Sequence, residues 1–251
     1  MKPFINALIL GAIVTGLKFL LWRNGLTYWD LSLISISGLI AGIFFSLTVM
    51  FRSALMDYKE ADKNICSIRG KVSAMNDINL RAAIVSKEDY NPRPLSMYFI
   101  TVLKTIRSYL ENDEDFNKLQ DTLNNINYEA RVLEGVIPAN LVSRFLQCQD
   151  HLRGFVSYLE YGKSLKFARV GYIFLYFFIF ALLVLQLFST TPNIPLELIF
   201  IFSLSSVLIF FAELIRDLDS PFNRKKAAFA VDLKPLDNGV TAIERSLKEL
   251  K

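Results

Sequence analysis

The sequence predicts an all-α membrane protein in which four transmembrane helices are continuous with a cytoplasmic helical domain. Three observations predict this class: 53% of the 251 residues are hydrophobic, the apolar residues fall into four separate blocks, and an apolar stripe of helical period continues past the second block. Each block has close to the ~20 residues that span a bilayer core. The blocks are Pro3–Trp22, Leu31–Phe51, Val170–Phe188 and Ile194–Leu214.

The first block is interpreted as a retained span and not as a cleavable secretory signal. It is longer than the apolar region of a signal peptide, it contains Lys18, and no small-x-small cleavage site precedes Arg23. We expect the long side chain of Lys18 to extend toward the nearer membrane interface.

The distribution of basic residues predicts the orientation in a plasma (inner) membrane. The loop RNGLTYWD between the first two blocks has one basic residue, and STTPN between the last two has none, whereas Lys and Arg flank the other ends of the blocks. Both termini are therefore expected in the cytoplasm. The predicted parts are 1–51 with two spans, 52–168 as cytoplasmic helices, 169–216 with two further spans, and 217–251 as a cytoplasmic C-terminal segment.

An apolar stripe predicts that the second span continues as a helix well beyond the membrane, because its members alternate at spacings of three and four. The prolines of DYNPRP then break the helix. Further helices are expected at Leu95–Leu110, Asp115–Leu133, Asn140–Tyr161 and Asn238–Leu250. The stripe consists of Tyr58, Ala61, Ile65, Ile68, Val72 and Met75.

Charge and motif content argue against nucleic-acid binding and catalysis. The net charge is +4, and the stretch 52–166 has 16 Lys/Arg against 15 Asp/Glu, with no basic stripe interleaved with aromatic residues. No nucleophile elbow, P-loop or dinucleotide-binding glycine pattern occurs. We therefore expect no enzyme activity, no cofactor and no nucleic-acid partner.

The sequence also predicts no metal site. His151 and Cys148 form one C-x-x-H pair, but a second pair that would complete a zinc site is missing, so a surface or core histidine is expected. The acidic stretch ENDEDF lacks the alternation and glycine of a calcium loop. Cys66 and Cys148 are expected to be free, buried thiols.

The stretch SISGLIAGIFFSLTVMFR contains the candidate functional residues. Ile36, Ile40 and Phe44 lie four apart and form one apolar line along a helix. Gly38 and Gly42 have G-x-x-x-G spacing on another part of the surface, which allows close helix approach within or between subunits. The spacing alone leaves two interpretations: the apolar line faces lipid or the third span, or a ring of copies lines a pore that gates by dewetting.

The segment GLIAGIFFSLTVMFRSALMDYKEADKN resembles the second span and following helix of bestrophins and bestrophin-like proteins. Phe51 and Arg52 match a Phe-Arg-like pair at the end of the family's pore helix. Lys59 stands where members often have arginine, and Asp62 where they often have glutamate. Ala54 departs from the family, which has asparagine at this position.

The C-terminal part is similar to the same family. Pro221-Phe222 and the segment DLKPLDNGVTAIERSL resemble the family's Pro-Phe pair and its trailing D-L-x-x-L…I-E pattern. The acidic cluster that binds calcium in animal members is absent after Pro221, and so is the proline-rich approach to the third span. Calcium gating is therefore not expected.

The resemblance implies a homo-oligomeric, pentameric ion channel in the lipid bilayer, with the second span around the pore. Counted back from Arg52, Ile36, Ile40 and Phe44 fall on the positions of the family's hydrophobic neck. The permeant inorganic ion is expected to be an anion such as chloride, while cation conduction stays open. The alternative is a non-conducting membrane scaffold or sensor, in which the row faces lipid and the Tyr58–Met75 stripe binds a protein partner.

Overall fold

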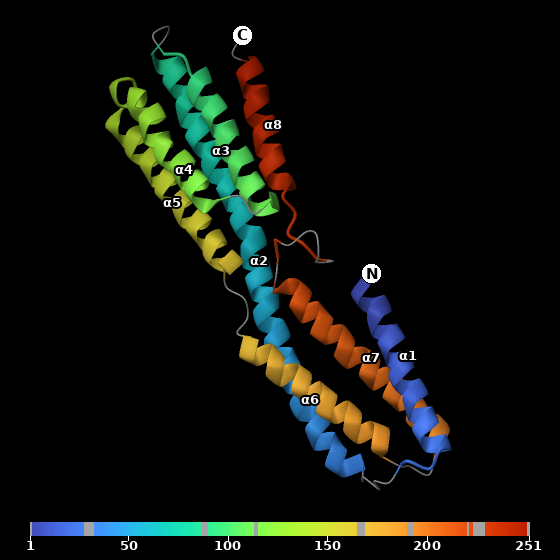
Figure 1. Ribbon diagram of the computed structural model, residues 1–251. Helices are drawn as coiled ribbons and strands as arrows, with labels where there is room; N and C mark the ends of the chain where they lie inside the picture. Colours follow the sequence, from blue (N-terminus) through green and yellow to red (C-terminus); the bar gives the residue numbers. More distant parts are fainter. Residues whose placement is uncertain are drawn as a thin grey trace. The chain divides into compact units, whose positions relative to one another are not determined.

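The computed structural model describes residues 2–27, 33–86, 90–112, 115–164, 169–189, 193–219, 221–222 and 229–249. Every element in these ranges is a helix, which confirms the predicted all-α class (Figure 1). The helices are α1 (Lys2–Arg23), α2 (Leu33–Val85), α3 (Arg93–Asn112), α4 (Phe116–Ala130), the 3-10 helix η1 (Arg131–Gly135), α5 (Ala139–Ser164), α6 (Arg169–Phe188), α7 (Ile194–Leu218) and α8 (Lys234–Glu249).

The helices belong to two compact units, which are described separately. The span unit comprises Met1–Tyr58 and Lys166–Ala230, and the extension unit comprises Lys59–Leu165 and Val231–Lys251. Helix α2 is a single 53-residue helix that contributes residues to both.

The span unit contains four helices that are long and apolar enough to cross a membrane: α1, α2, α6 and α7. α1 packs mainly along α7 (Figure 1), while α2, α6 and α7 share a buried core. Large apolar side chains such as Phe4, Phe45 and Phe180 are exposed on the outside of the unit. An apolar exterior of this kind suits a lipid environment, and the chain is a multi-pass membrane protein.

A glycine permits the close approach of α1 to α7. A Cβ atom added to Gly11 would collide with Oγ of Ser206 and lie 3.3 Å from the carbonyl oxygen of Phe202. The absence of a side chain at Gly11 therefore leaves room for Ser206, and small residues of this kind allow the close approach of membrane helices.

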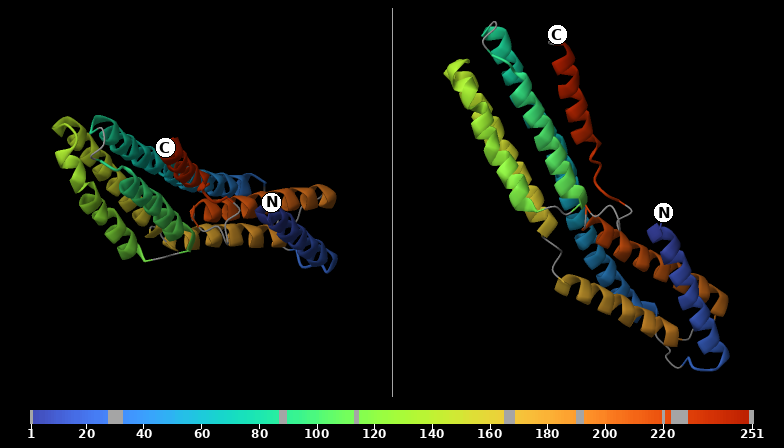
Figure 2. Two further views of the ribbon diagram at one scale, coloured as in Figure 1. Left: turned by 90° about the horizontal axis from the view of Figure 1, so that it is seen from above. Right: turned by 45° about the horizontal axis from the view of Figure 1, so that its top comes forward.

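The extension unit is built around the predicted apolar stripe. Ile65, Ile68, Val72 and Met75 of α2 are fully buried, and α3 contacts both α4 and α8 (Figure 2). The side chain of Asp115 accepts a hydrogen bond from the backbone N–H of Asn117 and caps α4. Helix α4 ends at Ala130, and the chain continues as the 3-10 helix η1. The last turn of the predicted helix Asp115–Leu133 is therefore a tighter 3-10 turn.

A buried polar network closes the turn between α2 and α3, where the prolines interrupt the helix. The Asn79 side-chain amide donates to the carbonyl of Pro92 (2.8 Å) and to the Ser96 hydroxyl (2.9 Å), and Ser96 donates to Asn76 (2.6 Å). The Tyr90 hydroxyl donates to Oδ1 of Asn79. Burial raises the pKa of Tyr90 to about 12, because the phenolate would lose its hydration.

Both cysteines are free, as predicted, but only Cys148 is buried. The expectation that Cys66 is buried is wrong: it lies on α2 outside the apolar stripe, and its side chain is exposed.

Candidate functional site

Helix α2 presents three different surfaces in the span unit. Ile43, Leu47 and Ala54 are buried in the core shared with α6 and α7. Ile40 and Phe44 are half-buried at the edge of that core. Phe45 lies on a third face, and within the described part of the chain its side chain is 73% exposed.

Two of the three predicted neck residues can be located in the structure. Ile40 and Phe44 lie on the same side of α2, one turn apart, and both pack partly against the apolar core. Ile36 belongs to α2, but its side chain lies outside the described residues. The hydrophobic neck stays a prediction.

The predicted glycine pair lines a groove on the surface of the span unit. Gly38 and Gly42 have no atom within 4 Å of an added Cβ, so no helix in the described part of the chain packs against them. The groove has a volume of about 440 Å³ and a largely apolar wall in which Phe174 and Phe178 of α6 are stacked. Packing between subunits at Gly38 and Gly42 stays a prediction.

A buried ion pair joins α1, α6 and α7. Nζ of Lys18 lies 2.8 Å from Oε1 of Glu197, and their side chains are 1% and 6% exposed. Lys18 also donates to the backbone carbonyls of Gln186 (3.0 Å), Leu187 (3.3 Å) and Ser189. The Ser189 hydroxyl contributes a hydrogen bond of 2.9 Å to Glu197.

The Lys18 side chain thus reaches the end of a neighbouring span, as a long side chain can, but its ammonium is buried in an ion pair. Its ammonium satisfies carbonyl groups at the C-terminal end of α6, where a positive charge is favourable. Glu197 lies in the first turn of α7, where a negative charge is favourable. Glu197 was not singled out from the sequence, although a carboxylate inside an apolar span signals a buried partner.

The residues singled out from the family motifs lie on α2 and just after α7. Arg52, Lys59 and Asp62 are exposed on α2. Pro221 is buried and Phe222 half-buried, just after α7 ends at Leu218. The structure brings none of the three charged residues into an ion pair with another described residue.

The sequence and the structure were compared with those of known proteins. No family model matches the sequence, and no curated protein matches it. A single-residue variant of a bacterial bestrophin homologue from Klebsiella pneumoniae is similar over 98% of this chain and 97% of that chain, with a TM-score of 0.77 and 14% identity. A structure of that homologue phased with zinc gives a TM-score of 0.76 at 14% identity, over 98% and 97% of the two chains. The chain has the fold of a bestrophin homologue.

A further crystal structure, of a protein described as a membrane protein, covers 99% of this chain and 98% of its own, with a TM-score of 0.78 and 14% identity. The bestrophin fold extends over both units, because these similarities cover nearly the whole chain. The resemblance inferred from the two short motifs is thus confirmed at the level of the fold.

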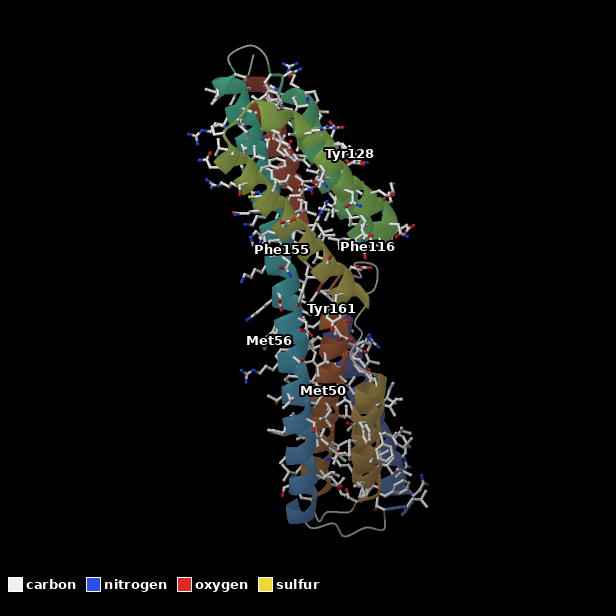
Figure 3. All side chains as sticks on the ribbon, turned by 90° about the vertical axis from the view of Figure 1, so that its left-hand side faces the viewer. Met50, Met56, Phe116, Tyr128, Phe155 and Tyr161 are labelled. Atoms are coloured by element: carbon white, nitrogen blue, oxygen red, sulfur yellow. The ribbon has the colours of Figure 1, made fainter. Side chains whose placement is uncertain are left out.

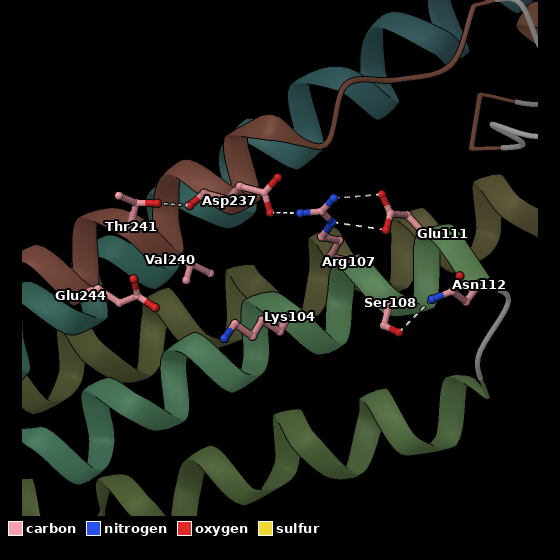
Figure 4. Close-up of a pocket in the computed structure, with 9 residues that line it drawn as sticks. All are labelled: Lys104, Arg107, Ser108, Glu111, Asn112, Asp237, Val240, Thr241 and Glu244. Carbon is pink, nitrogen blue, oxygen red and sulfur yellow. Dashed lines mark hydrogen bonds and ion pairs between the residues drawn. The ribbon is translucent and has the colours of Figure 1, made fainter.

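In this bestrophin fold, the C-terminal motif forms α8 and docks on α3. Leu236 and Ile243 are buried, and Arg107 of α3 forms ion pairs with Asp237 of α8 and, at 3.3 Å, with Glu111 of its own helix (Figure 4). Arg107, Glu111 and Asp237 also line a polar groove of about 440 Å³ between α3 and α8. The Arg107 bridge holds α8 at the groove, so the second motif has a docking role in the extension unit.

The described residues contain no group of three or more His, Cys, Asp or Glu side chains placed to hold a metal ion. His151 lies exposed on α5, as a surface histidine does.

Proposed function

We propose that the chain is the subunit of a homo-oligomeric, pentameric ion channel whose pore is lined by α2. The observation that supports this most strongly is the similarity to a bestrophin homologue over 98% of the chain. In this proposal Ile36, Ile40 and Phe44 form the hydrophobic neck, and the extension unit and both termini lie in the cytoplasm of a plasma (inner) membrane.

The surface of α2 is compatible with a position at a symmetry axis. Ile40 and Phe44 stand at the edge of the core and keep a partly open surface. Ser46 and Thr48 donate their hydroxyl hydrogens to carbonyls four residues earlier, at 2.9 and 2.7 Å. These intrahelical bonds satisfy the hydroxyls within the helix, so they add limited polarity to a pore wall.

The proposed neck gates by excluding water. A ring of Ile and Phe side chains offers no hydrogen-bond partner to a permeating ion, so a narrow ring dewets and forms a barrier. Truncation of these side chains widens and hydrates the ring. The neck variants should therefore conduct more than the wild type.

Single-channel recording in planar bilayers tests this proposal. We expect Ile40→Ala and Phe44→Ala to raise the unitary conductance. Phe45→Ala is the matched control, because it removes the same side chain about 100° further round the helix, on the exposed face. A wild-type protein that is silent under every salt gradient contradicts the proposal, and so does an equal effect of Phe44→Ala and Phe45→Ala.

The proposed permeant ion is an anion such as chloride. The reversal potential in asymmetric potassium chloride tests this, because it shifts toward the chloride equilibrium potential for an anion channel and toward the potassium potential for a cation channel. A shift toward the potassium potential refutes the choice of ion and leaves the channel proposal intact.

The scaffold interpretation lacks the partner surface that it requires. It assigns partner binding to the Tyr58–Met75 stripe, yet Ile65, Ile68, Val72 and Met75 are completely buried within the chain. The oligomeric state in mild detergent separates the two interpretations. A stable monomer removes the channel proposal, since the span unit of one chain cannot form a ring.

A further inference from the structure

A hollow on the extension unit lies between α2 and α5. Its volume is about 400 Å³, far more than the ~30 Å³ that one water molecule occupies in the liquid. The residues that line it are Glu60 and Asn64 of α2 and Asp150, His151, Gly154, Phe155 and Tyr158 of α5. A hollow of this size accommodates a small organic molecule.

The charge of the lining is negative. Glu60 and Asp150 contribute two carboxylates from opposite helices, while no Lys or Arg belongs to the lining. The lining therefore favours a cation over an anion or a neutral molecule.

A buried amide in the lining has hydrogen-bonding capacity to spare. Asn64 is only 7% exposed, and its side chain has no hydrogen-bond partner among the residues that the structure describes. The amide is therefore available to pair with a polar group of a molecule that enters the hollow. Its oxygen accepts and its nitrogen donates.

Aromatic side chains complete the wall. Phe155 and Tyr158 are three residues apart on α5 and therefore share one face of that helix, and Phe155 lies on α5 beside α2 (Figure 3). Gly154 adds no side chain, and the space beside it is open. The faces of aromatic rings attract organic ammonium groups.

We propose that this hollow binds a small organic ammonium cation that also has a hydrogen-bonding group. Glu60 and Asp150 supply the opposite charge, Phe155 and Tyr158 contact the alkyl groups on the nitrogen, and Asn64 pairs with the polar group. The site is separate from the neck and does not depend on the chain being a channel.

Isothermal titration calorimetry on the full chain in lipid nanodiscs tests this inference, with choline as the probe. We expect choline to bind the wild type, and its neutral carbon isostere dimethylbutanol to bind at least about tenfold more weakly. The double variant Glu60→Gln/Asp150→Asn should lose about tenfold in affinity, because both opposite charges are removed. Phe155→Leu, which keeps an apolar side chain without a ring, should lose about threefold.

The matched control is Asp121→Asn/Glu134→Gln, which changes the net charge equally at exposed positions outside the lining and should bind choline as the wild type does. The inference is overturned if the wild type does not bind choline, or if dimethylbutanol binds as tightly. It is also overturned if the two double variants behave alike, or if magnesium binds at the hollow and displaces choline. Glu60 and Asp150 are exposed, so their neutralisation leaves the fold intact, which circular dichroism checks.

Discussion

The Lys18–Glu197 pair offers a sharp test of how the first span is held against the rest of the span unit. The perturbation is Lys18→Met, Glu197→Gln and the combination of both. In Lys18→Met, the Glu197 carboxylate remains buried with the Ser189 hydroxyl at 2.9 Å as its nearest donor in the cluster. In Glu197→Gln, Lys18 keeps the carbonyls of Gln186 and Leu187, at 3.0 and 3.3 Å, among its acceptors.

The two substitutions should therefore differ in cost. Removal of one partner from a buried pair costs about 3–5 kcal/mol, because an uncompensated charge stays in a water-free site. We expect Lys18→Met to reach this range. Glu197→Gln should cost about 1–3 kcal/mol, because the ammonium retains its carbonyl acceptors. The double variant should be more stable than the sum of the two losses predicts, since neither charge remains.

Equilibrium unfolding by sodium dodecyl sulfate in mixed micelles measures these free energies, and the fluorescence of Trp22 on α1 reports on the first span. The reasoning is refuted if Lys18→Met changes the free energy of unfolding by less than about 0.5 kcal/mol, as a solvated surface lysine does. It is also refuted if the double variant is fully additive, because the pair then contributes no coupling.

Three further outcomes follow from the described contacts. Gly11→Ala should destabilise the span unit by about 1–3 kcal/mol in the same assay, and Ser206→Ala should partly rescue it, because the added methyl collides with Oγ of Ser206. Between pH 10 and pH 12 the wild type should lose on the order of 2–3 kcal/mol relative to Tyr90→Phe in chemical denaturation, because the raised pKa favours the neutral phenol in the folded state. Arg107→Met should cost less than about 1 kcal/mol, since its pair with Asp237 is partly exposed, and a larger loss would contradict this.

The helices could be predicted because their causes are local in the sequence. The alternation of three and four in the Tyr58–Met75 stripe implied one helix past the second span, and α2 continues to Val85. The prolines in DYNPRP predicted a break in the helix, and the structure confirms it between α2 and α3.

The buried polar contacts could not be predicted in the same way, because they join residues far apart in the chain. Lys18 and Glu197 are brought together only by the packing of α1 on α7, and a lysine near a span end has a simpler expected position at the interface. The role of Gly11 depends equally on Ser206 of another helix. The stripe also predicted a packed face without saying whether the partner was this chain or another protein.

Cysteine accessibility along α2 tests the central claim most directly. In a Cys66→Ser background, which removes the exposed native thiol, single cysteines are placed at Ile40 and Phe44, and matched ones at the buried positions Ile43 and Leu47. We predict that a membrane-impermeant thiol reagent modifies the protein at 40 and 44 in liposomes and leaves 43 and 47 unmodified. Protection at 40 and 44 would contradict the assignment of this face of α2 to a water-filled pore.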